Sequence, residues 1–315
     1  MKRWTSFAMI QNEIAKNFIS GLVLTIGNFD GVHLGHQKIL ERVKKISMEN
    51  GWYSLVVSFK EHTSVLLRRQ SPLMLLSLDE RCNYFESAGM DGCLLLEFTP
   101  ELAQLPAESF LEKLVSLGTK ALVVGHDFTF GAGGAGNTDF VLNYAYKNAL
   151  YGEVIPPVKY HGKTVCSSRI RSLLTAGKLS EANGMLNRPF RLAGKVEPGN
   201  HRGKVLGFPT ANLAFPSNRL LPKFGVYFVR VFLEDNEYYG LANVGLKPTF
   251  NHNTPLVEVH LFDFSQEIYG CILVVDFLKF LREERKFVSP NELVAQMVKD
   301  KKIGKQYLSS WLQQA

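Results

Sequence analysis

The sequence predicts two domains: a mostly parallel α/β domain, then an antiparallel β barrel or sandwich that ends in a helix. The chain has 315 residues, of which 46% are hydrophobic, and this is more than one domain usually contains. In the first half, short apolar runs alternate with amphipathic helical patterns. After about Leu186, segments rich in β-branched and aromatic residues follow one another with turn residues between them.

The elements of the first half follow from apolar periodicity. Strands are expected over 22–26, 54–59, 93–98 and 121–125, and helices over 36–50, 78–88 and 107–117. Ser77 followed by Glu80 resembles a capping box, which marks the start of the second of these helices. Ligands of parallel sheets bind beyond the carboxyl ends of the strands, so we expect the binding loops after Ile26 and Val124.

The second half is expected to contain strands over 226–232, 257–262 and 272–280. A helix is expected over 290–312, with Gly304 as a candidate break. Another helix over 179–186 precedes the change of pattern. The domain boundary therefore falls between Leu186 and Asn187, which gives domains 1–186 and 187–315.

Composition narrows the classes of function. Four scattered cysteines predict neither a disulfide framework nor a metal cluster. The sequence shows no secretion-signal pattern and no apolar run of membrane length, so a cytoplasmic location is expected. The formal charge of +7 and the pI of about 9.1 suit anionic partners. Charged clusters such as 282–286 mix acids with bases, which favours nucleotide substrates over a nucleic-acid partner.

A glycine-rich loop, GNFDGVHLGH over 27–36, connects the first expected strand to the first expected helix. Glycines let the backbone approach phosphates, and a helix start offers free N–H groups and the positive end of its dipole. Two histidines in one tight turn can stabilise charge on a leaving pyrophosphate. The candidate ATP-binding residues are Gly27, Asn28, Asp30, His33 and His36, with the two histidines as catalytic candidates. The alternative is that the histidines only cap or pack locally.

This string resembles the HxGH signature of the nucleotidylyltransferase superfamily, in the form found at the start of bifunctional riboflavin kinase and FAD synthetase enzymes. That family carries a second phosphate-contacting signature, which residues 165–171 resemble. Two hydroxyls at a helix start and an arginine one turn later suit a phosphate clamp, here Ser167, Ser168 and Arg171. A plain helix cap with an exposed arginine is the alternative.

The resemblance also implies a flavin-proximal loop over 125–131, with Asp127, Phe128 and Phe130 as flavin-binding candidates. The two phenylalanines suit stacking on an isoalloxazine ring, and core packing is the alternative. Two stretches depart from the family pattern near the expected FMN site. Residues 60–63 keep only the histidine of a Pro-His-Pro stretch, and 132–135 lack the family's basic residues.

A second glycine-rich stretch runs over 199–212. Thr210 and Asn212 share one side of an extended segment and offer the oxygen ligands that Mg²⁺ prefers, while Lys204 can offset phosphate charge. An ordinary Gly-Pro turn is the alternative. The string LGFPTANL resembles the PTAN motif of riboflavin kinases, which binds nucleotide and magnesium. The implied ATP-binding residues are Lys204, Gly207, Pro209, Thr210 and Asn212.

Later segments match the same family in order, among them Glu258-Val259-His260-Leu261. The resemblance implies that Glu258 is the general base on the riboflavin 5′-hydroxyl and that Arg282 contacts flavin. A carboxylate suits the first role because it accepts the proton as the alcohol attacks the γ-phosphate. The alternative for Glu258 is an outward-facing strand residue.

From about Leu22 to Lys299, the resemblance implies a Rossmann-like nucleotidylyltransferase domain and a riboflavin kinase barrel. The implied reactions convert riboflavin and ATP to FMN and ADP, then FMN and ATP to FAD and pyrophosphate, both with Mg²⁺. One alternative is an enzyme with only the kinase active, which FAD formation from supplied FMN excludes. The other is a flavin-sensing or RNA-binding regulator, which predicts ligand binding without release of ADP or pyrophosphate.

Overall fold

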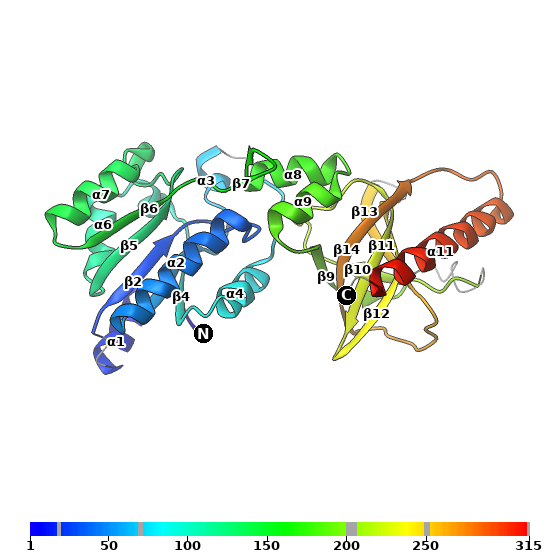
Figure 1. Cartoon of the computed structure of the whole chain (residues 1–315), viewed down its shortest axis with the longest axis horizontal. Coiled ribbons are helices and arrows are strands. Elements are labelled where there is room, and N and C mark those ends of the chain that lie inside the picture. Colours follow the sequence, from blue (N-terminus) through cyan, green and yellow to red (C-terminus); the bar gives the residue numbers. More distant parts are fainter. Residues whose placement is uncertain (18–19, 69–71, 200–206, 249–252, 314–315) are drawn as a thin grey trace. The chain divides into compact units, whose positions relative to one another are not determined.

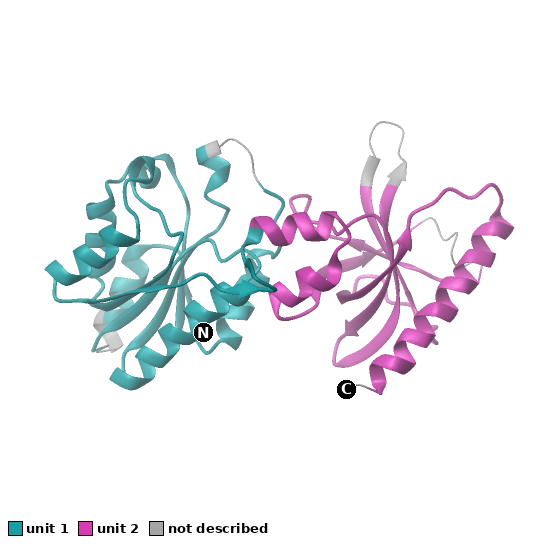
Figure 2. Cartoon of the chain, turned by 45° about the horizontal axis from the view of Figure 1, so that its top comes forward, with its two compact units in different colours: residues 1–167 teal, residues 168–315 magenta. Residues whose placement is uncertain are grey.

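The computed structural model describes residues 1–17, 20–68, 72–199, 207–248 and 253–313. The chain forms two compact units, residues 1–167 and 168–315 (Figure 2). Within the described residues, no helix is both long enough and apolar enough to cross a membrane.

The first unit is built on one sheet of six parallel strands in the order β1-β4-β3-β2-β5-β6 (Figure 1). These strands are β1 (Lys2–Trp4), β2 (Leu22–Ile26), β3 (Tyr53–Phe59), β4 (Gly92–Leu96), β5 (Thr119–Gly125) and β6 (Tyr151–Ile155). The parallel α/β prediction is therefore confirmed, and the four predicted strands correspond to β2, β3, β4 and β5.

Helices cover both faces of this sheet. They are α1 (Phe7–Asn17), α2 (Leu34–Asn50), α3 (Ser64–Arg68), α4 (Leu78–Ser87), α5 (Pro100–Ala103), α6 (Ala107–Val115) and α7 (Thr138–Lys147). One apolar core contains side chains of α1, α6 and α7, and the core on the opposite face contains side chains of α2 and α4. The capping box at the start of α4 is present, because the Ser77 hydroxyl accepts from the Glu80 N–H and the Glu80 carboxylate accepts from the Ser77 N–H.

Strand β2 is the switch point of the sheet. It pairs with β3 on one side and with β5 on the other, although β3 and β5 are far apart in the sequence. Chain connections run in opposite directions from such a point, and this leaves a crevice beyond the carboxyl ends of the two central strands. The loops after Ile26 and Gly125 therefore begin at the place where this fold binds ligands.

The second unit contains a closed barrel of antiparallel strands in the order β10-β13-β12-β11-β14-β9, which decides between the barrel and the sandwich. Its strands are β9 (Phe190–Glu197), β10 (Ala211–Ala214), β11 (Gly225–Leu233), β12 (Asn236–Pro248), β13 (Asn253–Leu261) and β14 (Ile272–Glu283). Helices α8 (Ser167–Thr175) and α9 (Leu179–Leu186) precede the barrel, and α11 (Pro290–Leu312) follows it.

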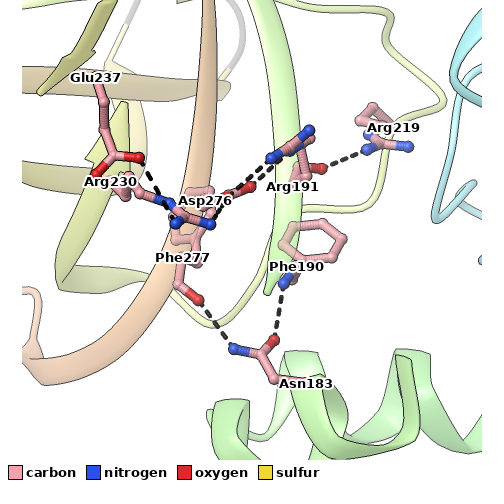
Figure 3. Close-up of polar contacts among 8 residues, drawn as sticks. All are labelled: Asn183, Phe190, Arg191, Arg219, Arg230, Glu237, Asp276 and Phe277. Atoms are coloured by element: carbon pink, nitrogen blue, oxygen red, sulfur yellow. Dashed lines mark hydrogen bonds and ion pairs between the residues drawn. The ribbon is translucent and has the colours of Figure 1, made fainter. Parts of the chain in front are cut away.

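Helix α9 is attached to the barrel through Asn183 (Figure 3). The Asn183 side chain donates to the Phe277 carbonyl (3.0 Å) and accepts from the Phe190 N–H (2.8 Å), so it joins α9 to β14 and to the start of β9. The compact units divide at the start of α8, between Ser167 and Ser168, whereas the change of sequence pattern used above lies after α9.

A cluster of ion pairs links three neighbouring strands of the barrel, β9, β14 and β11. Asp276 of β14 is 1% exposed and lies between Arg191 of β9 and Arg230 of β11 (Figure 3). Its carboxylate accepts from both guanidinium groups, at 2.6 Å from Arg191 Nε and 2.9 Å from Arg230 Nη2. A carboxylate buried this deeply needs such charged partners, and here one aspartate joins three strands of the barrel.

The terminal helix is continuous, so the candidate break at Gly304 is wrong. Gly304 is buried, and a Cβ at this position would lie 2.7 Å from the Phe262 ring and 3.0 Å from Leu241. The glycine lets the helix backbone approach the barrel closely. Leu308, one turn later, packs on the same apolar cluster. Packing against the barrel thus outweighs the weak helix propensity of glycine.

Candidate active sites in the two units

The loop between β2 and α2 has an unusual backbone. Phe29 and Val32 have φ values of 51° and 36°, although neither is a glycine, and both side chains are buried. Positive φ strains a β-branched residue in particular, and such strain persists only where the surroundings determine the conformation. Strained backbone is concentrated at functional sites, and this loop carries both predicted histidines.

The side chains of Asn28 and Asp30 hold this loop in place. The Asn28 amide accepts from the Thr63 N–H (3.2 Å) and donates to the Thr63 hydroxyl (3.1 Å). The Asp30 carboxylate is 1% exposed and accepts from the backbone N–H groups of Leu75 and Leu76, at 3.0 to 3.1 Å. Both side chains predicted to bind ATP thus have positions fixed by bonds inside the protein, and Gly27 begins the same loop.

The two histidines lie together where α2 begins. His33 is the N-cap residue of α2, and its Nδ1 accepts from the His36 N–H at 3.4 Å. Their rings stack with centroids 3.7 Å apart. A Cβ at Gly35 would lie 3.2 Å from the His33 ring, so the glycine between them leaves room for this arrangement. His33 does cap the helix, and this places both rings beside the free N–H groups at the start of α2.

The second predicted phosphate signature begins at Ser167. The Ser167 hydroxyl donates to the Asp30 carbonyl at 2.6 Å, which ties the start of α8 to the histidine loop. Ser168 and Arg171 follow on α8 and belong to the second unit.

The predicted flavin loop follows β5. Asp127 is exposed and Phe128 is half-buried, whereas Phe130 is buried in the core of the unit. The rings of Phe128 and Phe130 stack with centroids 5.1 Å apart. The structure therefore leaves Asp127 and part of Phe128 accessible to a ligand and puts Phe130 behind them. The segment 132–135 forms a closed turn between Phe130 and Gly136, which pair with each other.

In the barrel, several predicted residues occupy one row of cross-strand neighbours. Glu258 of β13 lies between Asn212 of β10 and Asn243 of β12. Continuing across β11, the row reaches Arg282 of β14. Cross-strand neighbours point to the same face of a sheet. The flanking Val257 and Val259 are buried, so Glu258 points away from the barrel interior, between two amide side chains.

The PTAN segment is held by His260. Its Nδ1 lies 2.9 Å from the Pro209 carbonyl, and its ring packs edge-on against Phe208. Burial lowers the pKa of His260, so the neutral ring with a proton on Nδ1 is the form that fits this contact. Thr210 follows directly, Gly207 precedes the segment with a φ of 81°, and Lys204 lies outside the described residues.

Two further contacts concern predicted ligands of the barrel. A Cβ at Gly199 would lie 2.0 Å from the Asn212 amide nitrogen, so only a glycine lets the chain pass this side chain. The Arg282 guanidinium donates from Nη2 to the Asp300 carboxylate of α11 at 2.7 Å, and from Nη1 to the Glu283 carbonyl. Asp300 thereby fixes Arg282 at the end of the row.

The sequence arguments did not single out Arg81, Asn243 and His260 as site residues. Asn243 and His260 lie in stretches that match the riboflavin kinase pattern, but only the structure shows the first beside Glu258 and the second against Pro209. Arg81 lies in no such stretch, and its contacts alone identify it.

The fold places the first unit in the class of Rossmann-like nucleotide-binding proteins and the second among closed antiparallel barrels. Sequence profiles agree with this division: residues 15–169 match the family described as FAD synthetase, and residues 186–308 match the family described as riboflavin kinase.

Two curated relatives match nearly the whole chain. The bifunctional riboflavin kinase/FMN adenylyltransferase of Bacillus subtilis is 35% identical over 312 residues, which cover 96% of each protein. The protein of the same name from Escherichia coli K12 is 34% identical over 294 residues, covering 91% of this chain and 93% of the relative. The chain belongs to the family of bifunctional riboflavin kinase/FMN adenylyltransferases.

One solved structure has the same fold over most of its length. A crystal structure from Streptococcus pneumoniae, described as a macrolide-efflux protein, superposes with a TM-score of 0.84 at 32% identity. The match covers 91% of this chain and 94% of that one.

Proposed function

We propose that the second unit phosphorylates riboflavin to FMN and that the first unit adenylylates FMN to FAD. The observation that carries this proposal is that the residues predicted for the two reactions fall in different compact units. The histidine pair lies at the switch point of the α/β unit, and Glu258 lies on the barrel of the other unit. The chain's membership of the family and the names of its relatives support the same two reactions.

In adenylyl transfer, a phosphate oxygen of FMN bonds to the α-phosphorus of ATP as the bond to the pyrophosphate oxygen breaks. His33 and His36 donate hydrogen bonds to the phosphates between which charge develops, and the start of α2 adds N–H groups and its dipole. Ser167, which belongs to the same unit as the histidines, is the phosphate contact that the family pattern assigns beside them. Asp127 and Phe128 contact the flavin, and Phe130 supports the Phe128 ring from the core.

In phosphoryl transfer, the 5′-hydroxyl oxygen of riboflavin bonds to the γ-phosphorus as ADP leaves. Glu258 takes the hydroxyl proton, and its cross-strand neighbours Asn212 and Asn243 lie on the same face of the barrel. Pro209 of the PTAN segment contacts ATP together with Gly207 and Lys204, which precede it in the sequence, and Arg282 contacts flavin at the other end of the row. These roles follow the family pattern residue by residue.

The barrel residues fit a magnesium ion bound together with ATP. Thr210 and Asn212 supply neutral oxygen ligands, and the glycine at 199 keeps the space beside Asn212 free of a side chain. When bound, Mg²⁺ neutralises charge on the transferred phosphate. A set of oxygen ligands with few carboxylates suits Mg²⁺, since this ion keeps several waters and uses phosphate oxygens as ligands.

Flavin chromatography tests the proposal directly. The purified chain is incubated with ATP and Mg²⁺ and either riboflavin or FMN, with an EDTA-treated sample as control. FMN and FAD from riboflavin, and FAD from FMN, are the expected products, and EDTA should abolish both. FMN without FAD would show that only the kinase works, and no conversion from either flavin would contradict the whole proposal.

A further inference from the structure

Arg81 of α4 is a charged side chain buried deep in the first unit, at 1% exposure. Burying a guanidinium costs free energy unless its N–H groups find acceptors. The acceptors in this case are almost all backbone carbonyls at the ends of two strands, and this choice of partners indicates a role in shaping loops.

The contacts of Arg81 join the loops that follow β2 and β3. Nη1 donates to the Asn28 carbonyl at 2.7 Å and to the Ser58 hydroxyl at 3.2 Å. Nη2 donates to the Phe59 carbonyl at 2.8 Å and to the Lys60 carbonyl at 3.1 Å. The planar fork of one arginine thus fixes both strand ends beside the switch point.

The same helix holds the histidine loop at a second place. The N–H groups of Leu75 and Leu76, just before the Ser77 cap of α4, bind the Asp30 carboxylate. Arg81 of α4 therefore holds the loop at Asn28. The backbone just before α4, at Leu75 and Leu76, holds it at Asp30. The strained residue Phe29 lies between these two attachments.

The positive charge of Arg81 also suits its position among backbone carbonyls. Burial lowers the pKa of Arg81, and the nearby Asp30 carboxylate acts in the opposite direction. Strand-end carbonyls present partial negative charge towards the crevice beyond the sheet. A cation bound to three of them offsets that charge beneath a site proposed to receive phosphates.

We propose that Arg81 is a positioning residue for adenylyl transfer, which holds the loop of His33 and His36 in its strained form without touching substrate. The inference rests on the proposed function of the first unit. Mispositioning of catalytic groups by about 1 Å can cost on the order of 100-fold in rate. Loss of the Arg81 hydrogen bonds should therefore lower mainly kcat for adenylylation.

Two Arg81 variants and one matched control test the inference. Arg81→Lys keeps the charge but loses the fork, and Arg81→Met loses both. Arg3→Met is the control, because Arg3 contacts the same helix through Asp79 and Asn83 and makes none of the loop contacts. Adenylylation of FMN and phosphorylation of riboflavin are measured on each preparation, with thermal unfolding to confirm the fold.

We expect Arg81→Lys to lower kcat for adenylylation about tenfold and Arg81→Met about 100-fold. KM for ATP should change less than about threefold, since the substrate contacts remain. Phosphorylation should stay within about twofold, and Arg3→Met should leave both reactions within that range. If Arg81→Met does not fold, Arg81→Lys decides. A folded Arg81→Lys protein with normal adenylylation, or one in which both reactions fall together, would overturn the inference.

Hydrogen exchange separates this inference from the proposed function, because it needs no catalysis. In Arg81→Lys, amides of residues 27–36 should exchange faster than in the wild type, while amides of the barrel keep their rates. Unchanged exchange over 27–36 would overturn the positioning role. Faster exchange in a protein whose wild type forms no FAD would show that Arg81 holds this loop and would contradict the proposed function instead.

Discussion

The imidazole rings of His33 and His36 stack almost in parallel, with centroids 3.7 Å apart and an interplanar angle of 15°. His33 caps α2, and His36 lies in the first turn of that helix. Phe29 approaches the His36 ring from another side, with centroids 5.0 Å apart. The two histidines thus form one stacked pair where α2 begins, beside the free N–H groups of that helix.

Replacement of His36 by alanine should remove FAD formation selectively. We expect kcat for adenylylation to fall about 100- to 1000-fold, because a donor aimed at developing phosphate charge is lost. FMN formation should be unchanged, since Glu258 belongs to the other compact unit. Chromatography of products from riboflavin and from FMN measures both, and equal loss of the two activities in a folded protein would contradict the assignment of separate sites.

Glu258→Gln should have the reverse effect. We expect phosphorylation of riboflavin to fall about 100- to 10,000-fold, because the amide cannot accept the hydroxyl proton. FAD formation from supplied FMN should continue. Glu237→Gln is a matched control, since Glu237 is another barrel glutamate, paired with Arg230 and Tyr239. A kinase that tolerates Glu258→Gln as well as it tolerates Glu237→Gln would remove Glu258 from the mechanism.

The buried His260 should make the stability of the barrel depend on pH. Burial lowers its pKa in the folded chain, so the unfolded chain binds a proton first as the pH falls below about 6.5. This contribution is complete above the unfolded pKa and decreases as the pH falls from there towards the folded pKa, by at most about 1.4 kcal/mol per pH unit.

The comparison variant for this effect is His260→Gln, whose amide can still donate to the Pro209 carbonyl but does not titrate. Urea unfolding of both proteins near pH 7.5 and pH 5.5 measures the difference. The wild type should lose more stability between the two pH values than the variant. An identical loss in both proteins would show that His260 does not take up a proton on unfolding.

Gly304→Ala should destabilise the second unit, although alanine is the better helix former. The added Cβ would meet Phe262 at 2.7 Å, and overpacking of this kind costs about 1–3 kcal/mol, against about 1 kcal/mol gained in helix propensity. Lys302→Ala, at an exposed position of the same helix, is the control and should change little. A higher melting temperature for Gly304→Ala would show that α11 can move away from the barrel at low cost.

Sequence periodicity predicted the four strands β2 to β5, the helices α2, α4 and α6 and the α4 cap, because each of these depends on residues close together in the chain. It missed the outer strands β1 and β6 and the helices α1, α3, α5 and α7. It could not order the strands or show that Asp30 binds the N–H groups of Leu75 and Leu76, since that contact joins segments 45 residues apart. Helix α11 was predicted in full, but whether Gly304 broke it depended on a distant phenylalanine.

The cysteines illustrate the same limit. Their spacing shows no motif, yet Cys82 of α4 and Cys93 of β4 are both fully buried. Interaction with the neighbouring Cys93 thiol lowers the pKa of Cys82. For the candidate sites, the family resemblance identified the motifs, whereas the residues that hold them, Arg81 and His260, became visible only through their contacts.

Mixing two single variants tests most directly whether the chain contains two independent sites. His36→Ala alone should convert riboflavin to FMN and stop, and Glu258→Gln alone should convert nothing from riboflavin. A mixture of the two proteins with riboflavin, ATP and Mg²⁺ should form FAD, because FMN released by one variant is adenylylated by the other. Failure of a folded His36→Ala protein to form FMN from riboflavin, or of a folded Glu258→Gln protein to form FAD from supplied FMN, would contradict the account of two separate sites.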